Sequence, residues 1–209
     1  MYNLTEYNNM RTRKHGKGFT LIELLVVIAI IGILASIVIP VVGSARVSAL
    51  KGKTKSQFTQ WASAMELFKM EYGYYPDVAD GNKVDTNRFL GALTARNPIG
   101  AAATSLYGNT KKIAFYTVSD SELTRGADGV VSSSSKIMDA FENEDIIVFV
   151  DTNGDGVIDS TDGASAKAVE SAATGGTLTP TITLPIRMGI IFYSAGKGER
   201  STDIVYSWK

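Results

Sequence analysis

The densest cluster of chemically useful side chains is an acidic loop at residues 151–162. In a twelve-position calcium loop, oxygen ligands come from positions 1, 3, 5, 7, 9 and 12, and glycine at position 6 permits a sharp turn. Here these positions hold Asp151, Asn153, Asp155, Val157 (through its carbonyl), Asp159 and Asp162, with Gly156 at the turn. Ca²⁺ prefers such hard oxygen ligands. The pattern therefore predicts a structural Ca²⁺ site. When a chelator removes the ion, the carboxylates of this loop would repel one another.

Two features set this loop apart from a helix–loop–helix calcium site. Position 12 is Asp162 rather than glutamate, as in the dockerin loops that this segment resembles. The apolar run Asp145–Val150 precedes the loop and predicts a strand instead of a helix. The alternative interpretation is an Asn/Asp/Gly turn that needs no metal.

Composition excludes several other kinds of chemistry. The chain has 209 residues, no cysteine, and a single histidine, His15, in a basic N-terminal stretch. Ser-His-Asp and Cys-His triads and the common zinc sites are therefore not expected. Lys and Arg balance Asp and Glu at 21 each, which argues against a nucleic-acid partner.

The N-terminal region predicts a membrane-spanning helix. No charged residue occurs between Leu24 and Ala45, and 22 helical residues span roughly 33 Å, enough for a hydrocarbon core of about 30 Å. The basic stretch that precedes the span is the usual cytoplasmic signal. Glu23 lies inside the apolar block, either as a functional intramembrane carboxylate or as a side chain that snorkels to the headgroup level.

The residues from Lys17 to Glu23, Lys-Gly-Phe-Thr-Leu-Ile-Glu, resemble the processing site of type IV pilins and type II secretion pseudopilins. The resemblance implies that a prepilin peptidase cuts between Gly18 and Phe19 and N-methylates Phe19. It also implies that Glu23 faces the Phe19 amine of a neighbouring subunit during assembly, and that the segment between Gly32 and Pro40 can unwind in a filament.

The implied fold is α+β, with a long N-terminal transmembrane helix packed on a small antiparallel head. We expect a leader at 1–18 (10–18 if translation starts at Met10), a transmembrane and assembly helix at 19–45, an amphipathic continuation at 46–75, and a head at 76–209. Apolar residues of the continuation recur every three or four positions, except for an eight-residue gap between Leu50 and Phe58. Gly73 and Pro76 predict its end.

The head is predicted to be an antiparallel sheet. Loops are expected over 77–110, and the strand candidates are Lys112–Val118, Asp145–Val150, Thr181–Tyr193 and Thr202–Trp208. The segment Ser194–Ile204 resembles the calcium-holding C-terminal loop of the major pseudopilin, but it is poor in aspartate, so we carry no ligands over to it.

The resemblance implies a non-enzymatic structural subunit of a type II secretion pseudopilus or type IV pilus-like filament. Its implied partners are further copies of itself, minor pilins or pseudopilins, the prepilin peptidase and an inner-membrane assembly platform. The N-terminus would be cytoplasmic and the head periplasmic or extracellular. Two alternatives remain: a secreted calcium-binding module cut by signal peptidase after Ala45, and a membrane-anchored extracellular enzyme.

Overall fold

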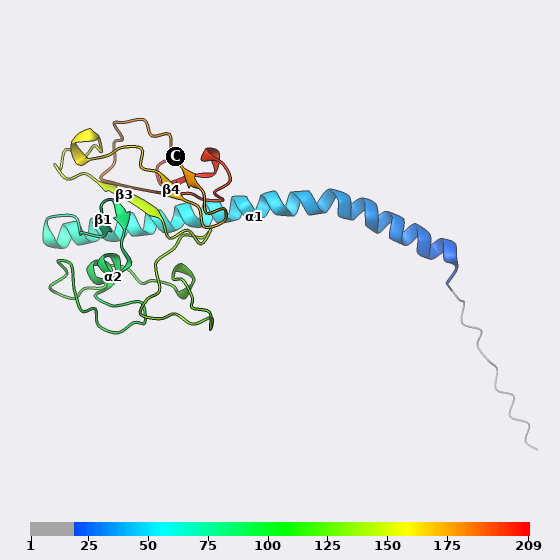
Figure 1. Ribbon diagram of the computed structural model, residues 1–209, viewed down its shortest axis with the longest axis horizontal. Coiled ribbons are helices and arrows are strands. Elements are labelled where there is room, and N and C mark those ends of the chain that lie inside the picture. Colours follow the sequence, from blue (N-terminus) through cyan, green and yellow to red (C-terminus); the bar gives the residue numbers. More distant parts are fainter. Residues whose placement is uncertain (1–18) are drawn as a thin grey trace, which may run out of the picture. The chain divides into compact units, whose positions relative to one another are not determined.

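The protein is described by a computed structural model over residues 19–209; the predicted leader at 1–18 lies outside the described residues. The chain divides into two compact units, Met1–Ser44 and Ala45–Lys209. The second unit is an α+β head (Figure 1), in agreement with the predicted fold class. Helix α1 (Leu21–Tyr72) contributes to both units and is helical at Gly32 and Pro40.

The second half of α1 is the central helix of the head. Its apolar stripe is fully buried at Phe58, Trp61, Met65 and Phe68. Thr54 fills the gap in the stripe, because its buried Oγ1 accepts a hydrogen bond from the Ala140 amide at 3.2 Å. The eight-residue interruption is therefore a polar anchor on the same helix face.

The end of α1 follows the predicted stop signal. Gly73 has φ of +83°, and its amide donates to the Lys69 carbonyl at 2.7 Å. This left-handed conformation is one that glycine adopts without a steric penalty.

A five-stranded antiparallel sheet lies along this helix, in the order β1-β2-β3-β6-β7. The strands are β1 (Ala79–Asp80), β2 (Lys83–Val84), β3 (Ile146–Val150), β6 (Ile190–Ser194) and β7 (Val205–Tyr206). The central pair aligns Ile146 with Ser194 and Val150 with Ile190. A separate two-stranded sheet joins β4 (Val169–Glu170) to β5 (Thr177–Leu178).

The central strands are apolar up to Ser194 at the end of β6 because both of their faces are buried. Val148 and Phe192 belong to the core that contains α1, whereas Phe149 and Tyr193 belong to a second core on the opposite face. Successive side chains of a strand point to opposite faces, so each strand supplies both cores. The predicted strand at Asp145–Val150 is confirmed as β3.

Helix α2 (Thr86–Thr94) corrects the expectation that residues 77–110 are loops. Asp85 caps the helix by accepting from the Arg88 amide at 2.9 Å, and Phe89, Leu90 and Leu93 are buried. The predicted strand at Lys112–Val118 is wrong. The amides of Phe115 and Tyr116 donate instead to the carbonyl of Leu93 in the last turn of α2, where no intrahelical donor remains.

The two C-terminal strand predictions were too long. Pro185 has no amide hydrogen, and Ile186 forms only an isolated bridge with Ile158, so β6 begins at Ile190. Within the predicted strand Thr202–Trp208, residues Ser201–Asp203 form a 3₁₀ turn, and only β7 pairs with the sheet.

Glu122 provides a pH-dependent probe of the packing around α2. Tyr116 donates its hydroxyl to both carboxylate oxygens, at 2.9 and 2.8 Å. Burial raises the pKa of Glu122, and the hydrogen bond from Tyr116 opposes this effect only in part. The folded state therefore binds this proton more tightly than the unfolded state does.

We expect the free energy of unfolding to gain a contribution from Glu122 as pH falls through its raised pKa, and to lose it as pH rises again. Urea unfolding of the full chain in detergent, between about pH 7 and about pH 4, should show a smaller rise for Glu122→Gln than for the parent. Equal pH profiles for the two proteins would contradict this assignment.

Candidate functional site

The first candidate site is the start of α1, where Thr20 and Glu23 cap each other. Glu23 Oε2 accepts from the Thr20 amide at 2.8 Å and from the Thr20 hydroxyl at 2.7 Å. The Glu23 amide in turn donates to Thr20 Oγ1 at 3.3 Å. This capping box satisfies backbone donors that the first turn of a helix leaves free.

The sequence analysis did not predict that Thr20 is a local hydrogen-bond partner of Glu23. The signal was present in Thr20-Leu21-Ile22-Glu23, which fits the capping-box pattern of Ser or Thr followed three residues later by Glu. Phe19 precedes the box and is 80% exposed. Gly18, the other side of the predicted cut, lies outside the described residues.

The helix that follows exposes its apolar side chains. Every large apolar residue that the structure describes between Phe19 and Val42 is exposed, each by at least 44%. The hydroxyls of Ser36 and Ser44 donate to the carbonyls of Ile33 and Val41, so they do not need solvent. This helix is long and apolar enough to cross a membrane, and none of its most apolar window is buried within the structure.

The acidic loop, residues 151–162, leaves the end of β3 and closes on itself. Asp151 is buried, and its two carboxylate oxygens accept from the amides of Gly154 and Gly156 at 2.7 and 2.8 Å. Both glycines have φ near +80°. Asp162 accepts from the Thr152 amide and hydroxyl, at 2.8 and 2.7 Å, and joins the two ends of the loop.

These hydrogen bonds also favour the ionised form of Asp162. Burial acts to raise its pKa, but the hydrogen bonds from Thr152 and from the Asp159 amide outweigh burial and lower it. Asp155 and Asp159 likewise accept from the amides of Val157 and Thr161. The carboxylates therefore serve backbone donors in this arrangement.

A calcium site would need the oxygen ligands of this loop to converge. Among the described residues, no group of three or more His, Cys, Asp or Glu side chains converges closely enough to hold a metal. The donor set has the chemistry that Ca²⁺ prefers. Each Asp151 oxygen accepts one amide hydrogen bond and keeps a second lone pair that could bind an ion. Calcium at Asp151, Asn153, Asp155, Val157, Asp159 and Asp162 stays a prediction.

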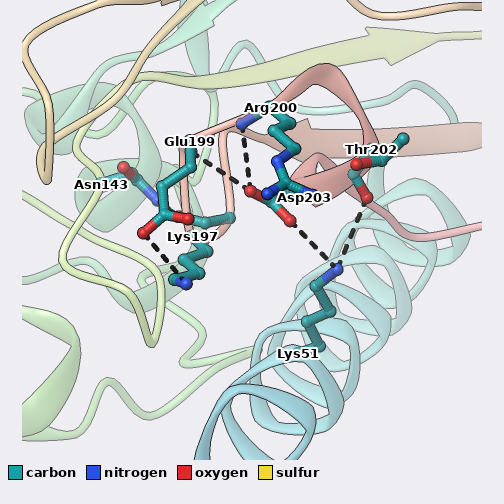
Figure 2. A network of polar contacts seen from close by, with 8 residues as sticks. Lys51, Asn143, Lys197, Glu199, Arg200, Thr202 and Asp203 are labelled. Carbon is teal, nitrogen blue, oxygen red and sulfur yellow. Dashed lines mark hydrogen bonds and ion pairs between the residues drawn. The ribbon is translucent and has the colours of Figure 1, made fainter. Parts of the chain in front are cut away.

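The C-terminal segment around Asp203 is held by a lysine of α1 (Figure 2). Lys51 Nζ lies 3.8 Å from Asp203 Oδ1 and 3.5 Å from the Thr202 carbonyl oxygen. The other Asp203 oxygen accepts from the amides of Glu199 and Arg200, at 3.2 and 3.1 Å. Asp203 therefore closes the turn and ties it to the helix.

Asn143 fixes the same segment from the buried side. Its amide group donates to the carbonyl of Gly196 at 2.9 Å and to Asp139 Oδ2 at 3.0 Å. Its side-chain oxygen accepts from the Ala172 amide at 2.9 Å. One buried side chain thus joins three separate loops.

Comparison with known proteins places the first site in a recognised class. The pattern described as the "Prokaryotic N-terminal methylation motif" matches residues 13–39, which include the capping box and most of the exposed apolar helix. The motif agrees with the sequence resemblance, and the long apolar helix with an antiparallel sheet has the pilin-like α+β architecture that was predicted. The motif and the apolar helix together fit anchoring in a membrane.

Three similar proteins share the name type II secretion system core protein G. The chain is 38% identical over 72 residues to the type II secretion system core protein G of Escherichia coli, covering 34% of this chain and 50% of that protein. It is 40% identical over 73 residues to the Pseudomonas aeruginosa protein of that name, covering 33% of this chain and 49% of that protein. The Aeromonas hydrophila protein of that name is 35% identical over 85 residues, covering 41% of this chain and 59% of that protein.

The chain thus spans about half the length of the curated relatives that it matches. No solved structure matches it.

The calcium prediction can be tested by substituting Asp155, an exposed residue of the loop. We expect Asp155→Ala to lower the melting temperature of the full chain clearly in calcium and only slightly in chelator, because the ion-bound loop loses a ligand whereas the ion-free loop loses only exposed hydrogen bonds from Val157 and Asn153. The matched control is Asn143→Ala, which removes buried hydrogen bonds and should cost about 1–3 kcal/mol in both conditions. Equal melting of Asp155→Ala and parent in both conditions would reject the site.

Proposed function

We propose that the chain is a structural subunit of a helical filament of the type II secretion pseudopilus or type IV pilus kind. The observation that carries this proposal is the exposed apolar helix with the Thr20–Glu23 capping box at its start, inside the methylation motif. Relatives named as type II secretion system core protein G favour the secretion pseudopilus. The role is structural rather than catalytic.

Processing would create the assembly-competent N-terminus. A prepilin peptidase would cut between Gly18 and Phe19 and methylate the new Phe19 amine. The cut would remove the whole basic stretch and leave Phe19 directly ahead of the capping box. The helix would then begin with a cationic amine and, four residues later, the Glu23 carboxylate.

Glu23 can serve both its own helix and a neighbouring subunit. Only Oε2 receives the hydrogen bonds from Thr20; within residues 19–209, Oε1 receives none. The Phe19 amine of an adjacent subunit would fill this position, since an opposite charge offsets the cost of burying a carboxylate. Only a subunit at the correct height would satisfy both groups, so the pair would also set the register.

Before assembly, the subunit would wait in the bacterial inner membrane, with its N-terminus cytoplasmic and its head on the other side. Its partners would be further copies of the chain, minor pilins or pseudopilins, the prepilin peptidase and an inner-membrane assembly platform. A repeated heterologous contact that does not close generates a helical fibre.

The two alternatives receive less support. Signal peptidase would have to cut after Ala45, yet Gly43, Ser44 and Ala45 all lie inside the continuous helix α1. The methylation motif ends before these residues, at position 39. An enzyme would need convergent carboxylates in a cleft, and no spacing in the sequence demands this.

The assembly role of Glu23 can be separated from its capping role. We expect Glu23→Ala to be processed normally but to form no filaments, because the buried Phe19 amine of the neighbour would lose its partner. The matched control is Thr20→Ala, which removes the cap at a cost of about 1 kcal/mol but keeps the carboxylate, and should still assemble. The measurement is the sheared filament yield beside the processed chain in membranes; normal filaments from Glu23→Ala would contradict the pairing.

A further inference from the structure

A groove runs beside the C-terminal end of α1, between the helix end and the acidic loop. It has a volume of about 600 Å³, and Tyr74, Pro76 and Val150 supply apolar lining. Asp151 and Asp162 of the acidic loop also line it. We call this feature the acidic groove.

Exposed apolar side chains on α1 and the residues just after it surround the helix end. Leu67 and Tyr74 are about half exposed, and Met70 is 82% exposed. Leu67 and Met70 are three residues apart and share one face of α1, and Tyr74 follows the helix end after Gly73. Exposed apolar side chains gathered beside a groove are typical of an interaction surface.

The groove is negatively charged on balance. Asp151 and Asp162 of the acidic loop line the groove, Asp155 and Asp159 lie in the same loop outside the lining, and residues 151–162 contain neither lysine nor arginine. Within the described part of the chain, none of these four carboxylates forms an ion pair. The one lysine in the groove lining is Lys69, whose ammonium lies 4.0 Å from the centre of the Tyr75 ring.

A complementary surface lies at the opposite end of the same helix portion. Residues 46–55, which we call the basic segment, contain four cations and no anion: Arg46, Lys51, Lys53 and Lys55. Lys51 is paired with Asp203, and Lys55 donates to the carbonyl of Lys209. Arg46 and Lys53 are exposed, and neither has a carboxylate partner among residues 19–209.

The two surfaces of one molecule cannot meet. Lys53 and Gly73 are 20 residues apart on one helix, which at about 1.5 Å per residue places them roughly 30 Å apart. The occupant that matches the groove in charge is therefore the basic segment of a second copy. Such a head-to-tail contact is heterologous and repeats without closing, which generates a fibre.

We propose that the acidic groove of one subunit receives the basic segment of the next subunit, with Lys53 and Arg46 facing Asp162 in the groove and Asp155 at its edge, where Asp155 Oδ2 accepts from the lining residue Asn153 at 3.0 Å. This inference rests on the proposed filament function and names the contact between heads. The partially buried Val47 and Leu50 of the basic segment would add apolar contact with the exposed face at Met70 and Tyr74.

The absence of native cysteine allows a direct test. A full-length chain with Lys53→Cys and Asp155→Cys, oxidised in cells that assemble it, should give a ladder of disulfide-linked oligomers on a non-reducing gel. The matched control pairs Lys53→Cys with Glu170→Cys, an exposed carboxylate position on β4 that lies outside both the groove lining and the acidic loop, and should give no ladder. A ladder from the control alone, or from neither pair while filaments form, would overturn the proposal.

Charge reversal tests the same contact without cysteine. We expect Lys53→Glu and Asp155→Lys each to reduce filament yield, and the double variant to restore it. Reduced yield from Lys53→Glu that Asp155→Lys does not rescue, with no cross-linked ladder, would assign the basic segment to anionic lipid headgroups and overturn the proposal.

Failure of this contact can be distinguished from failure of the filament function. If the parent forms filaments that Glu23→Ala abolishes, but the Lys53–Asp155 pair does not cross-link, only the head contact is wrong. If the processed parent gives no filaments in cells that assemble such fibres, the proposed function itself is wrong.

Discussion

One physical constraint governs this protein: the first half of α1 exposes apolar side chains that nothing in its own unit covers. Each large apolar side chain left in water forgoes roughly 1.5–3 kcal/mol of burial free energy. A helix with so many of them, between Phe19 and Val42, must be covered by lipid or by other protein chains. Membrane anchoring and assembly into a fibre both satisfy this requirement, in that order along the proposed pathway.

The second half of the same helix buries its apolar stripe and forms the centre of the folded head. Trp61 and Phe68 lie in a core shared with the sheet and α2, while Thr54 anchors the loop at Ala140. Lys51 then fastens the C-terminal turn to the helix through Asp203. One continuous helix therefore carries an uncovered apolar surface in its first half and a buried apolar stripe in its second half, as expected of a filament subunit.

The sequence predicted what depends on local pattern. The apolar span, the buried stripe, the helix stop at Gly73 and the strand at β3 follow from periodicity and turn chemistry, and the structure confirms them. Long-range pairing decided the rest. Phe115 looked like a strand residue, but its amide found the free carbonyl of Leu93, and that outcome depends on where α2 ends. The capping box at Thr20 is also a local pattern, Thr followed three residues later by Glu, although Glu23 was interpreted only as an intramembrane carboxylate or a snorkelling side chain.

The most direct test of this account is the intact mass and N-terminal sequence of the protein recovered from membranes. The account predicts a chain that starts at Phe19 and is heavier by one methyl group than the unmodified processed chain. That result would join the methylation motif at 13–39 to the exposed helix in one functional unit. A chain that starts after Ala45 would have lost the apolar helix and Glu23 together, and it would contradict the filament function.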